Sequence, residues 1–281
     1  MLATFLSLLV LQVGPDPSAG GIQGIPDELL NRPPREAPAE VEAEAKPSPR
    51  SEYLSRCLAL ATSGPEDALD FANQWRMQVE SDLELAQSAH CLGLALVRLE
   101  RFEEARQIFE VASAEAPETL PAYRARLAAM AGNAALADGK PATAEPLFQQ
   151  AVAQAGAAAD EALVGSLQVD RARALVAAGR PDDAVEALVA ARTAAPDDAR
   201  AWLLSATLSR WLERLGEAQE QIQRAADLDP RDPAIGLEAG VIAALAGRED
   251  DARRSFESVL LVAPDSDEAY RARAYLEQLT P

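Results

Sequence analysis

The sequence has few of the side chains that usually carry catalysis or bind metals. Its 281 residues include one histidine, His90, and two cysteines, Cys57 and Cys91. Adjacent helical residues point about 100° apart, so His90 and Cys91 form no nucleophile–base pair. The cysteines, the histidine and the carboxylates show no metal-ligand spacing, and no glycine-rich loop follows a strand. We therefore expect no enzyme activity, no cofactor and no metal site.

Positive charge is also scarce. The chain has 45 acidic and 26 basic residues, which gives a formal net charge of −19 at pH 7. Nucleic acids and anionic membrane surfaces are polyanions, so we expect neither as a partner. The acidity is typical of a soluble protein with a long exposed surface. Two lysines against 24 arginines, together with abundant alanine, indicate a GC-rich bacterial genome.

Long apolar runs are missing except at the N-terminus. Residues 1–13 are interrupted only by Thr4, Ser7 and Gln12. This run is too short to span a bilayer but has the length of a signal-peptide core. It contains no lysine or arginine, and its cleavage site is indistinct. We expect residues 1–20 to be a signal peptide or short hydrophobic segment that directs the chain to the periplasm. The alternatives are an inner-membrane anchor with the rest facing the periplasm, and a tail without a targeting role.

The sequence does contain a repeat of about 34 residues. In five successive units one position is alanine, the position four later is large and apolar, and a second small residue follows three later. The spacings between the first alanines are 39, 40, 34 and 34 residues. The alanines are Ala105, Ala144, Ala184, Ala218 and Ala252, and the large residues are Phe109, Phe148, Leu188, Ile222 and Phe256.

Each unit has the pattern of two helices. Apolar residues recur at three- and four-residue spacing on both sides of short breaks such as 138–141 and 178–181. A proline near the end of most units suits the first turn of the next helix. This pattern resembles the tetratricopeptide repeat family. The resemblance implies an all-α, right-handed solenoid of about five to six helix pairs with a C-terminal capping helix, whose role is protein–protein interaction.

The repeat positions divide the chain into segments. Residues 21–50 are rich in proline and glutamate and should form a disordered linker. Residues 155–159 are predicted to lengthen one connection, because Gly156 stands where most other units have proline. The predicted segments after the linker are a degenerate first repeat at 51–85, five units within 86–266 (86–119, 125–158, 165–198, 199–232 and 233–266), and a capping helix at 267–281.

The resemblance also implies a peptide-binding groove, formed by positions 2, 5, 9 and 12 of each first helix. Four of these positions are arginine and none is acidic, so the sequence predicts a locally positive groove with apolar walls. Such a surface would bind an acidic, moderately apolar peptide or protein segment. The alternative is that these arginines are solvated helix surface. The predicted groove residues are Leu94, Val97, Arg126, Asn133, Leu136, Arg173, Val176, Arg200, Leu203 and Arg210.

The two cysteines are 34 residues apart, which places them on the first helices of adjacent units under the same alignment. In an oxidising compartment Cys57 and Cys91 are a disulfide candidate. The alternative is a pair of buried, reduced cysteines that behave as small apolar residues.

The leading functional interpretation is a non-enzymatic interaction scaffold in the bacterial periplasm that holds a peptide in the concave groove. The alternative is a membrane-tethered accessory factor in envelope assembly or secretion, whose repeats recruit an enzyme or substrate. It would contact a membrane only if the N-terminal segment is retained. An enzyme is the third possibility, and the inventory of residues opposes it.

Overall fold

The computed structural model describes residues 51–79 and 81–279, where all regular structure is α-helical. Twelve of the helices in this part follow one another as six pairs, and α14 (Asp267–Gln278) ends the stack. The predicted α-solenoid with a C-terminal capping helix is confirmed. The predicted segments 1–20 and 21–50 lie outside the described residues. The pairs are α2 (Ser51–Ser63) with α3 (Pro65–Arg76), α4 (Asp82–Arg98) with α5 (Phe102–Glu115), α6 (Pro121–Ala137) with α7 (Pro141–Ala157), α8 (Glu161–Ala177) with α9 (Pro181–Ala194), α10 (Ala199–Trp211) with α11 (Leu215–Leu228), and α12 (Pro233–Leu245) with α13 (Glu249–Val262).

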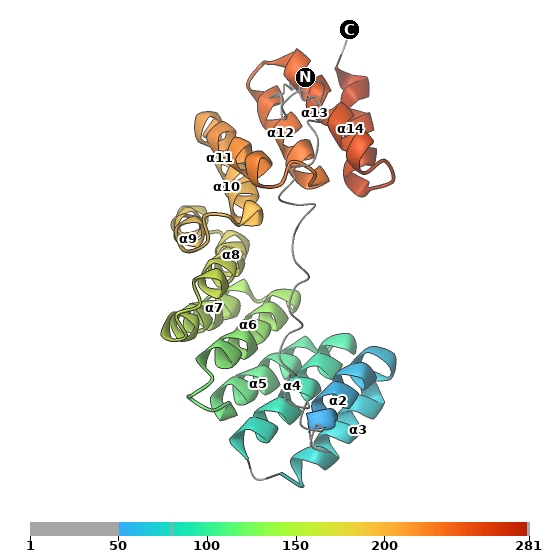
Figure 1. The fold of residues 1–281 in the computed structure, drawn as a ribbon, viewed down its shortest axis with the longest axis vertical. Helices are drawn as coiled ribbons and strands as arrows, with labels where there is room; N and C mark the ends of the chain where they lie inside the picture. Colours follow the sequence, from blue (N-terminus) through green and yellow to red (C-terminus); the bar gives the residue numbers. More distant parts are fainter. Residues whose placement is uncertain (1–50, 80, 280–281) are drawn as a thin grey trace, which may run out of the picture.

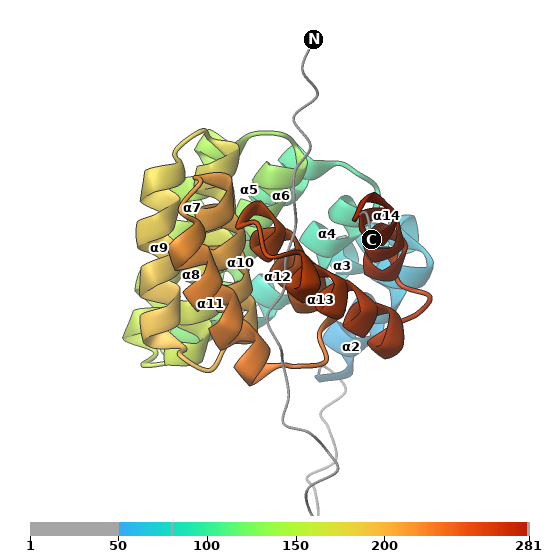
Figure 2. The same cartoon turned by 90° about the horizontal axis from the view of Figure 1, so that it is seen from above.

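The pairs wind into a superhelix. Figure 1 shows α2 and α3 at one end of the long axis and α14 at the other. Seen down that axis in Figure 2, α14 overlies α2 and α3, so the stack turns around the axis as it rises. In Figure 1 α5, α7 and α9 lie farther toward the left edge than α4, α6 and α8. First helices of successive units also contact one another, as α6 does with α8 and α8 with α10. The first helices therefore line the concave side.

Complementary side chains hold the two helices of each unit together. In three units a glycine of the first helix faces a buried phenylalanine of the second. A Cβ atom added to Gly93 would lie 2.5 Å from the ring of Phe109, and one on Gly132 would lie 2.9 Å from that of Phe148. The remaining units combine alanine with a smaller aliphatic residue. The five pairs are Gly93 with Phe109, Gly132 with Phe148, Ala172 with Leu188, Ala206 with Ile222, and Gly240 with Phe256.

Each turn between the two helices of these five units contains one residue with positive φ. Gly139, Gly179 and Gly247 have φ angles of 70°, 74° and 73°. Glycine suits this position because it has no Cβ atom to clash in the left-handed region. Glu100 and Glu213 occupy the same position with φ angles of 58° and 60°, which costs about 1–2 kcal/mol each.

A basic residue follows each of these turns, and in the last four units it contacts the preceding unit. The Nζ atom of Lys140 lies 3.1 Å from a carboxylate oxygen of Glu103 in the preceding unit, and Arg214 lies 3.2 Å from Asp182. Hydrogen bonds from Arg106, Gln107 and Lys140 lower the pKa of Glu103 to about 2. Because these groups are exposed, each pair contributes little on its own. The residues of this series are Arg101, Lys140, Arg180, Arg214 and Arg248.

The extra residues of the two longer repeat intervals extend helices. α6 begins at Pro121 and α8 at Glu161, each four residues before the unit boundaries predicted at 125 and 165. α7 continues through Gly156 to Ala157. The expectation that residues 155–159 only lengthen a connection is therefore wrong for 155–157. Glycine leaves the backbone N–H available for a helical hydrogen bond, which proline would remove.

Candidate peptide-binding groove

An apolar pocket of about 310 Å³ opens between α8 and α10. Leu188 of α9 forms a buried part of its wall, being 4% exposed. Val176 and Trp211 also line it, and they are 38% and 60% exposed. Large exposed apolar side chains beside a pocket are typical of an interaction site. The other lining residues include Val169, Ala172, Arg173, Leu204, Thr207 and Leu208.

A second apolar pocket, of about 190 Å³, opens between α4 and α6. Leu94 and Val97 of α4 and Met130 and Asn133 of α6 contribute to its lining. The buried ring of Phe109 reaches it from α5. Phe109 stands at the same repeat position as Leu188, and Val97 at the same position as Val176. The two pockets are therefore copies of one repeat site.

The residue at the sixth position of a unit differs between the units that begin at 125 and 199 and those that begin at 165 and 233. It is apolar at the pockets, where Met130 and Leu204 line them. It is acidic in the units that begin at 165 and 233, where Asp170 and Glu238 stand. Glu238 accepts hydrogen bonds of 2.6 and 3.3 Å from Arg210 of α10. This ion pair joins α10 to α12, whereas Asp170 pairs with Arg173 of its own helix and with Arg200 of α10.

Three of the predicted groove arginines gather around two carboxylates in the middle of the stack. Arg173 and Arg200 lie 3.2 and 3.5 Å from the same oxygen of Asp170. Arg126 lies 3.8 Å from Asp160. The three arginine side chains are 56%, 51% and 53% exposed for Arg126, Arg173 and Arg200, so a ligand can reach them.

The predicted positive charge of the groove is smaller than the sequence count suggested. That count used four positions per unit and so omitted Asp160, Asp170 and Glu238. Arg210 is largely committed to Glu238, and its side chain is only 25% exposed. Four arginines therefore face three carboxylates, which leaves a local excess of one positive charge.

The predicted apolar residues divide into two groups. Leu94, Val97 and Val176 line the pockets, together with the polar Asn133 and the charged Arg173. Leu136 and Leu203 instead pack, partly buried, against the hydrophobic core and line neither pocket.

Most of the other pocket residues were not among the predicted ones. Of these, Met130, Leu204 and Trp211 occupy positions 6 and 13 of their units, outside the four positions used for the prediction. The sequence offered little indication of them beyond Trp211, a large aromatic residue near the end of a first helix.

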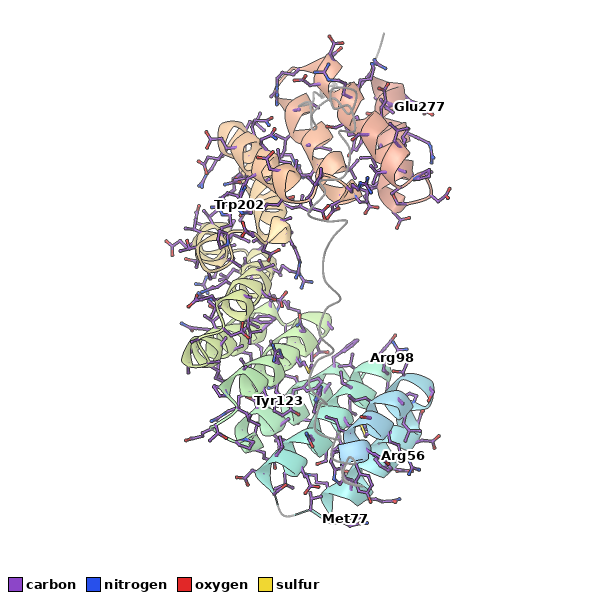
Figure 3. The ribbon with its side chains drawn as sticks, viewed as in Figure 1. Arg56, Met77, Arg98, Tyr123, Trp202 and Glu277 are labelled. Atoms are coloured by element: carbon purple, nitrogen blue, oxygen red, sulfur yellow. A yellow bond between two sulfur atoms is a disulfide. The ribbon has the colours of Figure 1, made fainter. Side chains whose placement is uncertain are left out.

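His90 of α4 lies beside Tyr123 of α6, and Tyr123 is labelled in Figure 3. The Nδ1 atom of His90 is 3.3 Å from the Tyr123 hydroxyl. Burial lowers the pKa of His90 and raises that of Tyr123 to about 12. Both side chains are therefore neutral near pH 7, and they form a hydrogen-bonded contact between adjacent first helices.

A disulfide joins Cys57 of α2 to Cys91 of α4, with the two Cα atoms 6.0 Å apart. This separation lies within the usual range of about 4.4–6.8 Å for disulfides. Both side chains are fully buried, in a small core cluster that includes Ala61 and Leu92. The bond fastens the first helix pair to the rest of the stack.

Within residues 51–79 and 81–279, no group of three or more histidine, cysteine or acidic side chains could hold a metal ion. Helices of the described part also lack the combination of length and apolar character that crossing a membrane requires.

Comparison with known proteins identifies the repeats. Residues 169–233 and 212–269 match a protein-family model described as the tetratricopeptide repeat. These residues are therefore similar to tetratricopeptide repeats. The match runs from within α8 to the start of α14, and the earlier helix pairs continue the same solenoid. None of the curated proteins matches the chain.

Solved structures show the same fold at low sequence identity. PilF of Pseudomonas aeruginosa has a TM-score of 0.59 and 14% identity, covering 80% of this chain and 97% of that one. BtubC from P. vanneervenii has a TM-score of 0.56 and 15% identity, covering 81% and 94%. A double mutant of MamA RS-1 has a TM-score of 0.51 and 18% identity, covering 64% and 94%. At these identities the likeness shows the tetratricopeptide-like solenoid fold alone.

Proposed function

We propose that this chain is a non-enzymatic scaffold that binds an acidic, moderately apolar peptide or protein segment in its concave groove. The observation that carries the proposal is the apolar pocket between α8 and α10, with Val176 and Trp211 exposed beside it. Half-exposed arginines lie next to this pocket. A guanidinium group binds a carboxylate in two parallel hydrogen bonds, which adds orientation to the burial of apolar surface.

The proposal is tested by reversing charge in the groove. The double variant Arg173→Glu with Arg200→Glu should lose partners that the parent retains in affinity purification from cell extracts. Arg214→Glu with Arg224→Glu is a matched control, since these arginines are 40% and 42% exposed and lie away from the pockets. Circular dichroism should show that both variants keep the parental helix content. An unchanged set of partners in the groove variant would mean that binding occurs on another surface.

We also propose that the protein is bacterial and exported to the periplasm. Support comes from the Cys57–Cys91 disulfide, because such bonds persist in oxidising compartments. Closing a loop of 34 residues would stabilise the first helix pair by up to about 3–4 kcal/mol in the chain-entropy treatment.

Thiol labelling of the protein as isolated from its source tests the export proposal. Alkylation before and after reduction should reveal two thiols only after reduction. Two reactive thiols in the unreduced, denatured protein would contradict it. N-terminal sequencing of the same material separates a cleaved signal segment from one retained as an inner-membrane anchor.

A further inference from the structure

The two apolar pockets stand two repeat units apart on one face of the superhelix. One lies between α4 and α6 and the other between α8 and α10. Between the two pockets the chain places the first helices α6 and α8, which contact each other. A single ligand that runs across the first helices would therefore meet one pocket, then a polar stretch, then the second pocket.

We propose that the groove binds one extended segment through both pockets at once, and that this segment carries two apolar side chains six positions apart with acidic residues between them. This inference rests on the proposed peptide-binding function and adds to it the composition and spacing of the ligand.

The spacing follows from helix and strand geometry. Packed helices lie about 8–10 Å apart, so pockets separated by two first-helix steps are about 16–20 Å apart. An extended chain rises about 3.3 Å per residue, so five or six residues span this distance. Side chains of an extended chain alternate between its two faces, and only an even separation places both anchors toward the groove. Six positions satisfy both conditions.

The charge of the ligand follows from the arginines near the pockets. Arg126 is on α6, Arg173 lines the α8–α10 pocket, and Arg200 is on α10. These three arginines lie near Asp160 and Asp170, which leaves one guanidinium in excess. Asp170 is shared by two arginines, and its side chain is 16% exposed, whereas both arginines are more than half exposed. A ligand carboxylate can therefore bind their free N–H groups without displacing Asp170. An apolar or basic linker between the anchors would leave this excess charge unmatched.

The probe is an acetylated, fluorescein-labelled peptide with two leucines separated by five residues, of which three are glutamate. Fluorescence polarisation with the full chain should show that it binds about tenfold or more tightly than a peptide in which either leucine is serine, since burying one leucine is worth at least this factor. A peptide with its leucines three positions apart should bind like the single-leucine peptides. Replacing the glutamates with glutamine should also weaken binding.

Variants of the protein identify the pockets that the anchors occupy. Val97→Glu and Val176→Glu each place a charge in one pocket and should each reduce affinity to the level of a single-leucine peptide. Val111→Glu and Val189→Glu are matched controls, because both valines are exposed, at 39% and 47%, and line neither pocket. Asn133→Trp covers the α4–α6 pocket from an exposed position and replaces Val97→Glu if the latter lowers helix content.

The outcomes separate this inference from the proposed function. If Val176→Glu weakens binding but neither α4–α6 variant does, the groove binds a peptide and the two-pocket inference is wrong. Equal affinity for one-leucine and two-leucine peptides, or no binding of either, also overturns it. In these cases the partner purification with the Arg173 and Arg200 variants still decides whether the groove is a binding surface.

Discussion

Replacing Gly93 with alanine measures how closely the two helices of a unit approach. A Cβ atom at this position would lie 2.5 Å from the ring of Phe109, which is 1% exposed. Overfilling such a contact costs about 1–3 kcal/mol. Alanine gains back about 1 kcal/mol over glycine in a helix interior. We expect the steric cost to exceed this gain, so that Gly93→Ala lowers the free energy of unfolding by up to about 2 kcal/mol.

Alanine substitutions at two other glycines serve as comparisons for Gly93→Ala. The Cβ of Gly132→Ala would lie 2.9 Å from Phe148, so this variant should lose less than Gly93→Ala. Gly156 lies within α7 with nothing within 4 Å of its would-be Cβ. Gly156→Ala should therefore raise stability by about 0.5–1 kcal/mol. Urea unfolding followed by far-ultraviolet circular dichroism measures all three.

A double variant tests the cause. In the unit that begins at 165, Ala172 faces Leu188 in place of the glycine–phenylalanine pair. Adding Phe109→Leu to Gly93→Ala recreates that combination, so the double variant should be more stable than the sum of the single losses predicts. If the two changes are additive, or if Gly93→Ala stabilises as Gly156→Ala does, the proposed close contact does not limit packing.

Two further predictions concern a turn and a buried histidine. Glu213→Gly should raise the melting temperature, because glycine adopts the φ angle of 60° without strain. The net gain in the free energy of unfolding is about 0.5–1 kcal/mol, once the greater chain entropy of glycine in the unfolded state is subtracted. The control variant Glu220→Gly, inside α11, should lower the melting temperature. Burial lowers the pKa of His90 below its ordinary 6.5, so the unfolded chain takes up a proton first and stability should fall from about pH 7.5 to 5.5. His90→Gln should remove most of this pH dependence, and an unchanged profile would contradict the assignment.

The sequence was sufficient to predict the helix pairs because their determinants are local and repeated. Each unit carries its own small and large residues at fixed spacing, and neighbouring units contact through the same positions. Departures from the pattern were harder to interpret. The sequence pattern predicts Gly156 within a longer connection, whereas the backbone continues as helix to Ala157.

The groove was predicted less well because its properties depend on pairs of residues from different units. Asp170 contacts Arg200 in the next unit, and Arg210 contacts Glu238 in the unit after its own. A count of side chains at four positions per unit cannot show that an arginine is already paired. It also omits position 6, which is apolar at Met130 and Leu204 in the pockets and acidic at Asp170 and Glu238.

Packing within a unit and the pockets of the groove therefore depend on different positions of the same helices. The small residue at position 8 and the large one at position 24 change together, glycine with phenylalanine and alanine with leucine or isoleucine, which keeps the spacing within each unit constant. Position 6 is free of that constraint, and Met130, Leu204 and Glu238 use it to face the preceding first helix. It changes from Met130 to Asp170, Leu204 and Glu238 along the stack. This alternation gives the groove a period of two repeats, although the fold has a period of one. We therefore expect a ligand bound in the groove to carry its apolar anchor side chains at a spacing that matches two repeats.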